Sequence, residues 1–342
     1  MRAITYTRTG APDVLQPVDR DAAAPGPGEV RVRVVVSGVN PTDWKSRDGG
    51  SPGQELPFPE VVPNQDGAGV IDAVGPDVSD LAVGDRVWIM LAAHGRPTGT
   101  AQESTVLPVD RVAPLPDGLS FDLGASLGVP AVTAHRALTV AEDGPSRLAP
   151  GALAGRHVLV AGGAGAVGHA AIQLARWAGA TVITTVSSPE KGALATAAGA
   201  QHVVDYRATD AATAILEIAP DGVDLVVEVA PAQNAGLNQR VARNRASIAV
   251  YANNGGDTVT LPVVDSFVKN LRYQFLLLYT VGQEALDAAR ADIHLALIDG
   301  ALPVGEDAGL PLHRFPLERT ADAHQAVEDG VTGKVLIDVT PA

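Results

Sequence analysis

The chain has 342 residues, of which 46% are hydrophobic, with 36 glycines, 25 prolines and no cysteine. A chain of this length is too long for one ordinary hydrophobic core and predicts two domains, and the apolar content with frequent glycine and proline suits a compact α/β protein. The lack of cysteine excludes disulfides, cysteine-ligated zinc and thiolate nucleophiles. A formal net charge of -14 argues against nucleic acid or an anionic membrane as a partner. The N-terminus lacks the apolar segment of a signal peptide, so we expect a cytoplasmic protein that binds no membrane.

The first part of the chain, up to about Gly118, predicts short strands joined by loops. Residues 29–39 (EVRVRVVVSGV) alternate between polar and apolar and then become continuously apolar, which is typical of a partly buried strand. Two more strand candidates, GVIDAVG and DRVWIML, flank a turn-rich segment. Proline and glycine recur every few residues throughout this part.

From about Gly155 onward, short apolar strand candidates alternate with alanine-rich helix candidates. The strand candidates are HVLVA, ATVITTV, HVVDY, DLVVEVA and ASIAVYA, and segments such as AVGHAAIQLARWAG have helical spacing. This alternation indicates a parallel, doubly wound sheet. After Asp265 follow the apolar segment YQFLLLY, an amphipathic helix candidate and a closing strand candidate, KVLIDV.

The clearest chemical motif is a glycine-rich turn between the first strand and the first helix of this sheet. Gly163, Gly165 and Gly168 form the pattern G-x-G-x-x-G. Glycines there allow a tight turn and let a pyrophosphate approach the helix N-terminus. A purely structural turn is the alternative, but the flanking strand and helix favour a dinucleotide site. The candidate contacts are Gly163, Ala164, Gly165, Ala166 and Val167.

The end of the second strand of the sheet bears on which dinucleotide is bound. A site for NAD usually places Asp or Glu there, whereas this strand is followed by Ser187 and Ser188, with Lys191 shortly after. Hydroxyl groups and a cation suit the 2′-phosphate of NADPH. Ser188 could equally cap the next helix while Lys191 is solvated, and the two interpretations are compatible.

Several segments together resemble the medium-chain dehydrogenase/reductase superfamily, and within it the zeta-crystallin-like quinone oxidoreductases. The resemblance covers nearly the whole chain. It rests on the segments SGVNPTDWKSRDG, GAGVIDAVGPDVSDLAVGDRVW, LGVPAVTAHRAL, the glycine segment, GAQHVVDYR and TGKVLIDV. It implies a β-rich, GroES-like catalytic domain formed by residues 1–128 and 268–342. It also implies a Rossmann NADP-binding domain formed by residues 129–267.

The resemblance also implies roles for single residues. Asn40 matches an asparagine beside the nicotinamide, and Lys45 stands where many relatives carry a tyrosine. We take these two as the candidate catalytic residues. The resemblance implies further coenzyme contacts at Thr133, Asn253 and Lys334, and contacts with the 2′-phosphate at Lys191 and Tyr206, beside Ser187 and Ser188.

Zinc-dependent members of the superfamily carry a cysteine ligand where this chain has Asn40. They carry Gly-His-Glu where it has Asn64, Gln65 and Asp66. The resemblance therefore implies a zinc-independent enzyme. Without a Lewis acid, alcohol oxidation lacks a means of generating an alkoxide, whereas a quinone or enone is already electrophilic.

The sequence thus predicts a zinc-independent, NADPH-dependent oxidoreductase that passes a hydride to a quinone or similar conjugated carbonyl. One alternative is an enoyl or 2-alkenal reductase acting on an enone or enoyl thioester. An alternative of another class is a non-catalytic NADPH-binding protein similar to the lens crystallins. We also expect a homodimer, formed by pairing of a long apolar edge strand, Tyr273 to Tyr279, with its own copy.

Overall fold

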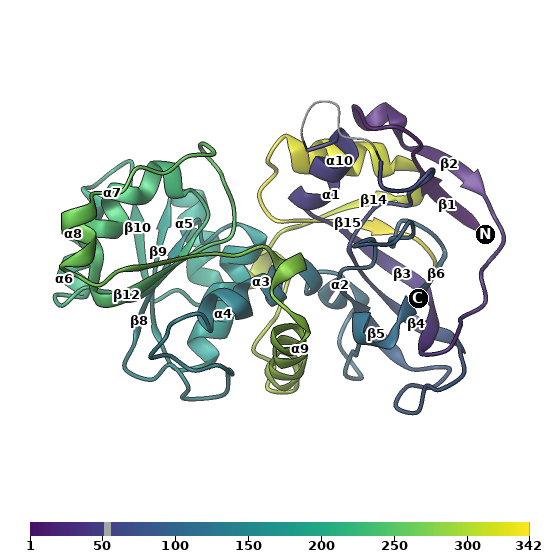
Figure 1. Cartoon of the computed structure of the whole chain (residues 1–342), viewed down its shortest axis with the longest axis horizontal. Coiled ribbons are helices and arrows are strands. Elements are labelled where there is room, and N and C mark those ends of the chain that lie inside the picture. The colour runs from purple at the N-terminus through teal and green to yellow at the C-terminus, as the bar shows by residue number, and fades with distance from the viewer. Residues whose placement is uncertain (51–55, 342) are drawn as a thin grey trace. The chain divides into compact units, whose positions relative to one another are not determined.

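The computed structural model describes residues 1–50 and 56–341. Its backbone contacts divide the chain into two units, which we call unit 1 (Met1–Val129 with Pro311–Ala342) and unit 2 (Pro130–Leu310). Figure 1 shows the N-terminal strands (purple) and the C-terminal strands (yellow) in the same unit. Residues 268–310 belong to unit 2, so the second domain boundary lies at 310 and the boundary expected at 268 is wrong. The physical reason is that strand β13 (Arg272–Phe275) pairs with the sheet of unit 2.

Unit 1 is built on a seven-stranded sheet whose long strand β3 (Glu29–Val39) pairs with β15, β4 and β6. The order is β14-β15-β3-β4-β5-β7, with β6 added on β3, and β1 and β2 form a separate antiparallel pair. The other strands are β1 (Arg2–Thr5), β2 (Gln16–Asp19), β4 (Asp66–Val74), β5 (Arg86–Ile89), β6 (Ser104–Pro108), β7 (Val112–Pro114), β14 (Leu312–Pro316) and β15 (Lys334–Asp338); the α-helices are α1 (Pro41–Asp48), α2 (Phe121–Gly124) and α10 (Thr320–Glu328).

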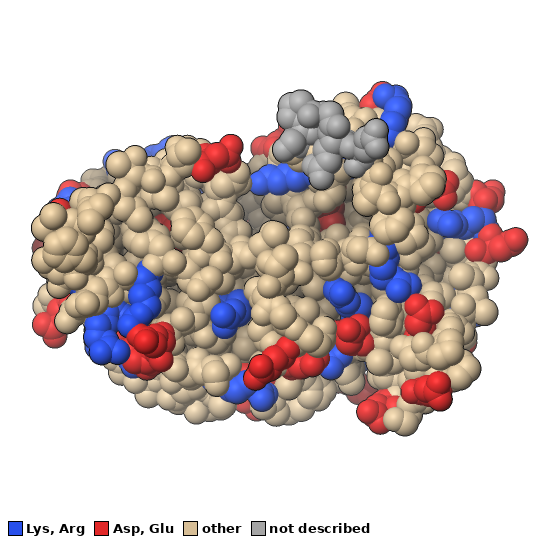
Figure 2. All heavy atoms as spheres, in the orientation of Figure 1, with Lys and Arg blue, Asp and Glu red and all other residues tan. Residues whose placement is uncertain are grey.

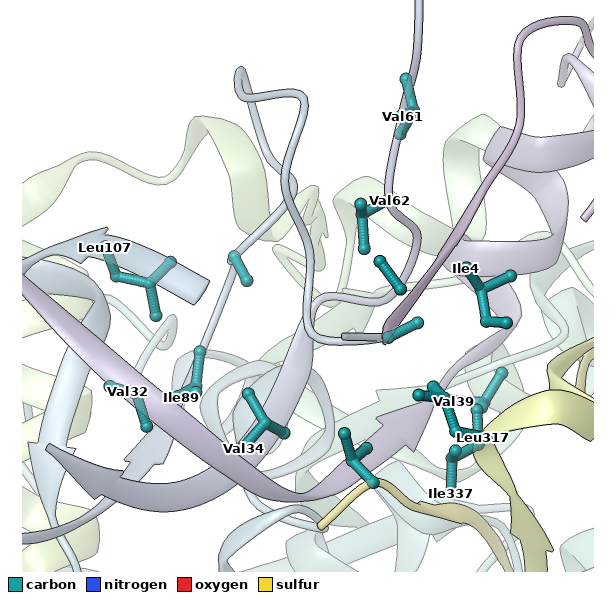
Figure 3. Packing of buried hydrophobic residues seen from close by; sticks show 14 of the residues in the cluster. Ile4, Val32, Val34, Val39, Val61, Val62, Ile89, Leu107, Leu317 and Ile337 are labelled. Carbon is teal, nitrogen blue, oxygen red and sulfur yellow. The ribbon is translucent and has the colours of Figure 1, made fainter. Parts of the chain in front are cut away.

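The core of unit 1 is formed by β-branched side chains that alternate along these strands. Val32 and Val34 of β3 are completely buried, as are Ile89 of β5 and Ile337 of β15. Figure 3 shows them packed with Leu107 and other apolar side chains of the same cluster. The alternation read from the sequence is therefore the pattern of a sheet with one buried face.

Unit 2 is a Rossmann fold. Its six strands are all parallel and have the order β10-β9-β8-β11-β12-β13, which is the order of a dinucleotide-binding sheet. The strands are β8 (His157–Ala161), β9 (Thr181–Val186), β10 (His202–Asp205), β11 (Val223–Glu228), β12 (Ala242–Val250) and β13; the α-helices are α3 (Gly128–Leu138), which begins in unit 1, α4 (Ala166–Trp177), α5 (Pro189–Ala197), α6 (Ala211–Ile218), α7 (Pro231–Val241), α8 (Val263–Phe267) and α9 (Gln283–Ile298).

The apolar segment 273–279 forms less strand than the sequence predicts. β13 ends at Phe275, and the chain continues through Leu277 into a short 3-10 helix, Leu278–Thr280. Leu278 turns inward and is buried, whereas Phe275 and Leu277 remain 59% and 57% exposed. β13 is still the last strand of its sheet, so the backbone groups on its outer side do not pair with another strand of the sheet.

Among the helices that the structure describes, none is long and apolar enough to cross a bilayer. Figure 2 shows one face of the molecule, on which basic side chains occur singly or in small groups beside acidic ones. No broad basic surface is visible on that face.

Candidate active site

The glycine loop of unit 2 joins β8 to α4 at the carboxyl edge of the sheet. Gly162 has a φ of +71°, a conformation that favours glycine. Gly165 is the N-cap of α4, and as a glycine it offers no side chain to the amide groups of the first turn. A helix N-terminus of this kind has backbone N–H groups and a positive partial charge available to an anion.

The three glycines of the motif have different steric surroundings. A Cβ on Gly163 would lie 2.2 Å from Oγ1 of Thr184, and one on Gly168 would lie 2.4 Å from the carbonyl oxygen of Gly162. Both positions therefore require glycine for the close packing of loop, helix and β9. A Cβ on Gly165 would meet nothing closer than 3.5 Å. The space beside Gly165 is therefore not filled by other protein atoms in the way that it is at Gly163 and Gly168.

The residues predicted to bind the 2′-phosphate follow strands β9 and β10 at the same edge of the sheet as the glycine loop. Val186 and Asp205 are register partners at the ends of β9 and β10, so Ser187 and Tyr206 leave the sheet side by side. The backbone N–H of Tyr206 donates to the carbonyl of Val186 over 3.2 Å. Tyr206 is 51% exposed, which leaves its ring accessible to a ligand.

Ser188 is the N-cap of α5, since its Oγ accepts from the backbone N–H of Lys191 over 3.4 Å. Ser188 thus has the helix-capping role that the sequence analysis gave as one of two compatible interpretations, the other being contact with the 2′-phosphate. The side chain of Glu190 also hydrogen-bonds to Ser188, which lowers the pKa of that exposed carboxyl. Glu190 was not among the residues predicted for this site, and its negative charge stands beside the predicted phosphate residues.

The other two predicted contacts of unit 2 lie on different elements. Thr133 is buried on α3. Asn253 follows β12, whose last residue Val250 pairs with Glu228 at the carboxyl end of β11, and its Nδ2 donates to Oδ1 of Asp257 over 2.5 Å. Asn253 therefore leaves the sheet at the same edge as the glycine loop.

In unit 1, Asn40 lies in a buried cluster with Lys334 and Asp66. The Nζ of Lys334 donates to Oδ1 of Asn40 over 2.7 Å, and Nδ2 of Asn40 donates to Oδ2 of Asp66 over 2.7 Å. Lys334 and Asp66 also form an ion pair at 3.4 Å, with side chains 1% and 0% exposed. These two bonds fix the orientation of the amide of Asn40. Burial lowers the pKa of Lys334 and raises that of Asp66, because it disfavours both charged forms.

Asp43 ties the two loops of this cluster together. Its Oδ2 accepts from the N–H of Asn40 over 2.7 Å, and its Oδ1 accepts from the N–H of Gln65 over 3.1 Å. Burial, reinforced by the nearby Asp66 carboxylate, raises the pKa of Asp43 to about 7. Lys45, further along α1, has its Nζ 5.9 Å from the centre of the Trp44 ring.

A chain of buried hydrogen bonds, which the sequence did not predict, supports the segment 64–66. His324 Nε2 lies 2.8 Å from Oδ1 of Asn64, whose Nδ2 donates to Oγ of Ser37 over 2.9 Å. Ser37 bonds to Thr100, whose hydroxyl donates to the carbonyl of Asp66 over 2.5 Å. Burial, with the charge of Arg47, lowers the pKa of His324 to about 3, so this imidazole is neutral. The only sequence signal was the polarity of these residues in otherwise apolar segments.

Asn40 and Gln65, which the resemblance places at the zinc-ligand positions of related enzymes, both have other hydrogen-bond partners in the structure. Asn40 is engaged by Lys334 and Asp66, and Oε1 of Gln65 accepts from the N–H of Ala93 over 3.1 Å. Within residues 1–50 and 56–341, no group of three or more His, Asp or Glu is placed to hold a metal ion.

Two family models match the chain. Residues 26–117 match the alcohol dehydrogenase GroES-like domain, and residues 166–292 match the zinc-binding dehydrogenase model. The quinone oxidoreductase of Lama guanicoe is 30% identical over 344 residues, which cover 98% of this chain and 97% of the relative. The chain belongs to the medium-chain dehydrogenase/reductase superfamily. Within it, the chain falls in the zeta-crystallin/quinone oxidoreductase branch and is an NAD(P)-dependent oxidoreductase.

Solved structures of this superfamily share the fold over the whole chain. An Escherichia coli quinone oxidoreductase complexed with NADPH has a TM-score of 0.80 at 25% identity, covering 99% of this chain and 100% of that one. An NAD-dependent alcohol dehydrogenase has a TM-score of 0.83 at 29% identity, covering 99% and 100%. A 2-haloacrylate reductase has a TM-score of 0.80 at 27% identity, covering 100% of both chains.

Proposed function

We propose that this oxidoreductase transfers a hydride from NADPH to a quinone or similar conjugated carbonyl compound, without zinc. The bonding of Asn40 carries the proposal: its amide is held by Lys334 and Asp66 where zinc-dependent relatives place a ligand. Without a Lewis acid, the reaction that needs least assistance is hydride transfer to an acceptor activated by conjugation. Similarity to the llama quinone oxidoreductase over 98% of the chain supports this class of acceptor.

NADPH, when bound, supplies the hydride, and the protein supplies binding and orientation. The backbone amides of Gly163 to Val167 would hold the pyrophosphate at the N-terminus of α4. Ser187, Lys191 and Tyr206 would hold the 2′-phosphate, since the register of β9 and β10 brings their segments together. The E. coli relative solved with NADPH supports this coenzyme, although Glu190 reduces the local positive charge.

The remaining assignments extend the same proposal. We assign Thr133, Asn253 and Lys334 to further contacts with the coenzyme, and Asn40 to the reacting nicotinamide. Lys45 is a candidate to orient the acceptor. A reduced quinone can take its protons from solvent, so the proposed reaction requires no dedicated acid among these residues.

A second candidate is reduction of the carbon–carbon double bond of a 2-alkenal, enone or enoyl thioester. The similarity to a 2-haloacrylate reductase at 27% identity favours it, because that relative is named for a conjugated alkene substrate. Both candidates use the same coenzyme site and differ in the acceptor. A non-catalytic NADPH-binding role, as in crystallins, would use the same coenzyme site without turnover of an acceptor.

One screen separates these three functions. Oxidation of NADPH is followed at its own absorbance band with 1,4-benzoquinone, an alkyl enone and an enoyl thioester as acceptors. The proposal predicts turnover that is fastest with the quinone. Faster turnover of the enone or thioester would establish the second candidate, and NADPH binding without turnover of any acceptor would establish the third.

A further inference from the structure

The buried hydrogen bonds that begin at His324 and end at Asp66 all run in one direction. Asn64 uses its Nδ2 as the donor to Ser37, so its Oδ1 is the acceptor for the Nε2–H group of His324. The hydroxyl of Thr100 donates to the carbonyl of Asp66, so the Ser37 hydroxyl donates to Thr100. Every donor therefore points from His324 toward Asp66, and hydrogen bonds aligned in this way strengthen one another.

His324 is the neutral donor that this chain of bonds requires. Its side chain is completely buried on α10, and burial, with the charge of Arg47, lowers its pKa to about 3. A neutral imidazole carries one proton, and in His324 this proton is on Nε2, the atom that donates to Asn64. Nδ1 has no hydrogen-bond partner among the residues that the structure describes. The bond with Asn64 therefore sets the tautomer of His324.

Asn64 occupies a backbone conformation that suits few residues. Its φ is +79°, a region that glycine adopts freely and that asparagine tolerates better than most other residues. Its side chain is 1% exposed, and both of its polar atoms are used, one toward His324 and one toward Ser37. Glycine would fit this backbone better but would leave the chain of bonds broken. The left-handed asparagine thus indicates a role for its amide.

Asp66 connects this chain of bonds to Asn40. The carbonyl of Asp66 accepts the last bond of the chain, from Thr100. Its carboxylate is 0% exposed, with Oδ2 accepting from Nδ2 of Asn40 over 2.7 Å and Oδ1 accepting from the N–H of Val129 over 2.8 Å. A shift of the Asp66 backbone would move this carboxylate, and the Asn40 amide would lose the partner that fixes its orientation.

We propose that Asn64 and His324 are positioning residues, which hold Asp66 so that its carboxylate keeps the Asn40 amide in the orientation needed for hydride transfer. The inference rests on the proposed function, in which Asn40 contacts the nicotinamide. Small displacements of a group that orients the reactants lower the rate steeply. Asn64 and His324 act through Asp66 rather than by contact with the coenzyme or the acceptor.

The kinetic test measures kcat and KM with the acceptor that the unmutated protein reduces fastest. Asn64→Gly removes the amide and suits the left-handed backbone, and His324→Leu removes the donor but keeps a bulky side chain. Each should lower kcat about tenfold. The KM for NADPH should stay within about twofold, because the proposed phosphate contacts are in unit 2. His324→Gln, whose amide N–H can replace the imidazole N–H, should recover most of the lost rate.

Thr320→Val is the matched control for these variants. Thr320 is a completely buried residue of α10, and its hydroxyl donates to the carbonyl of Leu317 over 2.7 Å, outside the chain of bonds. This variant loses one buried hydrogen bond on the same helix and should keep the kcat of the unmutated protein. If Asn64→Gly does not fold, Ser37→Ala interrupts the chain at a smaller side chain and should lower kcat by about the same factor.

The side-chain amide of Asn40 gives a measurement that does not require turnover. Hydrogen exchange of its Nδ2 protons, followed by NMR, should be at least about tenfold faster in Asn64→Gly and Ser37→Ala than in Thr320→Val. If the unmutated protein reduces no acceptor, the proposed function fails, and this exchange still tests whether the chain of bonds orients Asn40. Three results would overturn the inference: equal exchange in all variants, equal kcat in Asn64→Gly, Ser37→Ala and Thr320→Val, or a His324→Gln variant as slow as His324→Leu.

Discussion

Lys334 and Asn40, which are 294 positions apart in the chain, meet in the interior of unit 1, where Nζ donates to Oδ1 over 2.7 Å. The same ammonium group pairs with the Asp66 carboxylate at 3.4 Å. Both charged side chains are buried, so each charge is stabilised by the opposite charge of the other. The orientation of the Asn40 amide depends on its hydrogen bonds with both side chains.

Lys334→Met should destabilise the protein by about 3 kcal/mol, because it leaves the Asp66 carboxylate buried without its cation. Asp66→Asn alone should also destabilise, and the double variant should cost less than the sum of the two. Urea unfolding of the unmutated protein, the two single variants and the double variant gives the coupling energy between Lys334 and Asp66, which we expect to be about 1–3 kcal/mol. Strictly additive effects would show that the pair does not stabilise the cluster.

Lys191→Ala should reduce the preference for NADPH over NADH. Loss of one charge-assisted contact with the 2′-phosphate should cost about 1.5–3 kcal/mol, or roughly ten- to a hundred-fold in NADPH affinity. NADH affinity should be unchanged, which is the internal control. Dissociation constants come from calorimetry or from fluorescence of the reduced coenzymes. Equal affinities for NADPH and NADH in the unmutated protein would contradict the assignment.

Asp43 should make stability depend on pH between about 4 and 7. Its pKa is about 7 in the folded protein, against an ordinary value of 3.8, so the folded state binds the proton more tightly. The contribution of Asp43 to the free energy of unfolding is therefore greatest at low pH and is lost as pH rises through 7. The decrease between pH 5 and pH 8 should be on the order of 2 kcal/mol. Asp43→Asn should remove this difference.

Unfolding by urea at both pH values measures the effect of Asp43. Wild-type protein should lose more stability than Asp43→Asn on going from pH 5 to pH 8, because other titrating groups are common to both. Identical pH dependence in the two proteins would mean that the carboxyl of Asp43 titrates normally.

Leu277→Lys should weaken a homodimer formed at the edge of β13. Leu277 is 57% exposed next to an unpaired strand edge, and a second copy would bring like charges together. Light scattering should give twice the chain mass for the unmutated protein and a lower mass for the variant. Ile298→Lys, at a 60% exposed position on α9, is the control. A monomer mass at micromolar concentration would dismiss the dimer.

The local features of the fold were predictable from sequence because they depend on short-range patterns. Alternation in residues 29–39 indicated β3, and the glycine turn between a strand and a helix indicated the β8–α4 loop. The segment 273–279 was predicted less well. A run of apolar residues does not show where a strand ends, and Leu278 is buried by a 3-10 turn rather than by continued pairing.

The partners within the candidate site could not be predicted from sequence in the same way. Asp66 and Lys334 are 268 positions apart, and no periodicity connects them. The domain boundary at 310 likewise depends on the pairing of β13 with β12, which is a long-range contact. Family resemblance suggested Asn40 and Lys334 individually as candidate site residues but did not indicate the hydrogen bond between them.

The central claim is NADPH-dependent reduction of a quinone without zinc. Its most direct test is the rate of NADPH oxidation with 1,4-benzoquinone after dialysis against a zinc chelator, with zinc determined by elemental analysis of the same sample. We expect undiminished turnover in protein that holds no stoichiometric zinc, because Asn40 and Gln65 offer neither thiolate nor imidazole. Turnover that is lost on chelation and restored by zinc would contradict the claim.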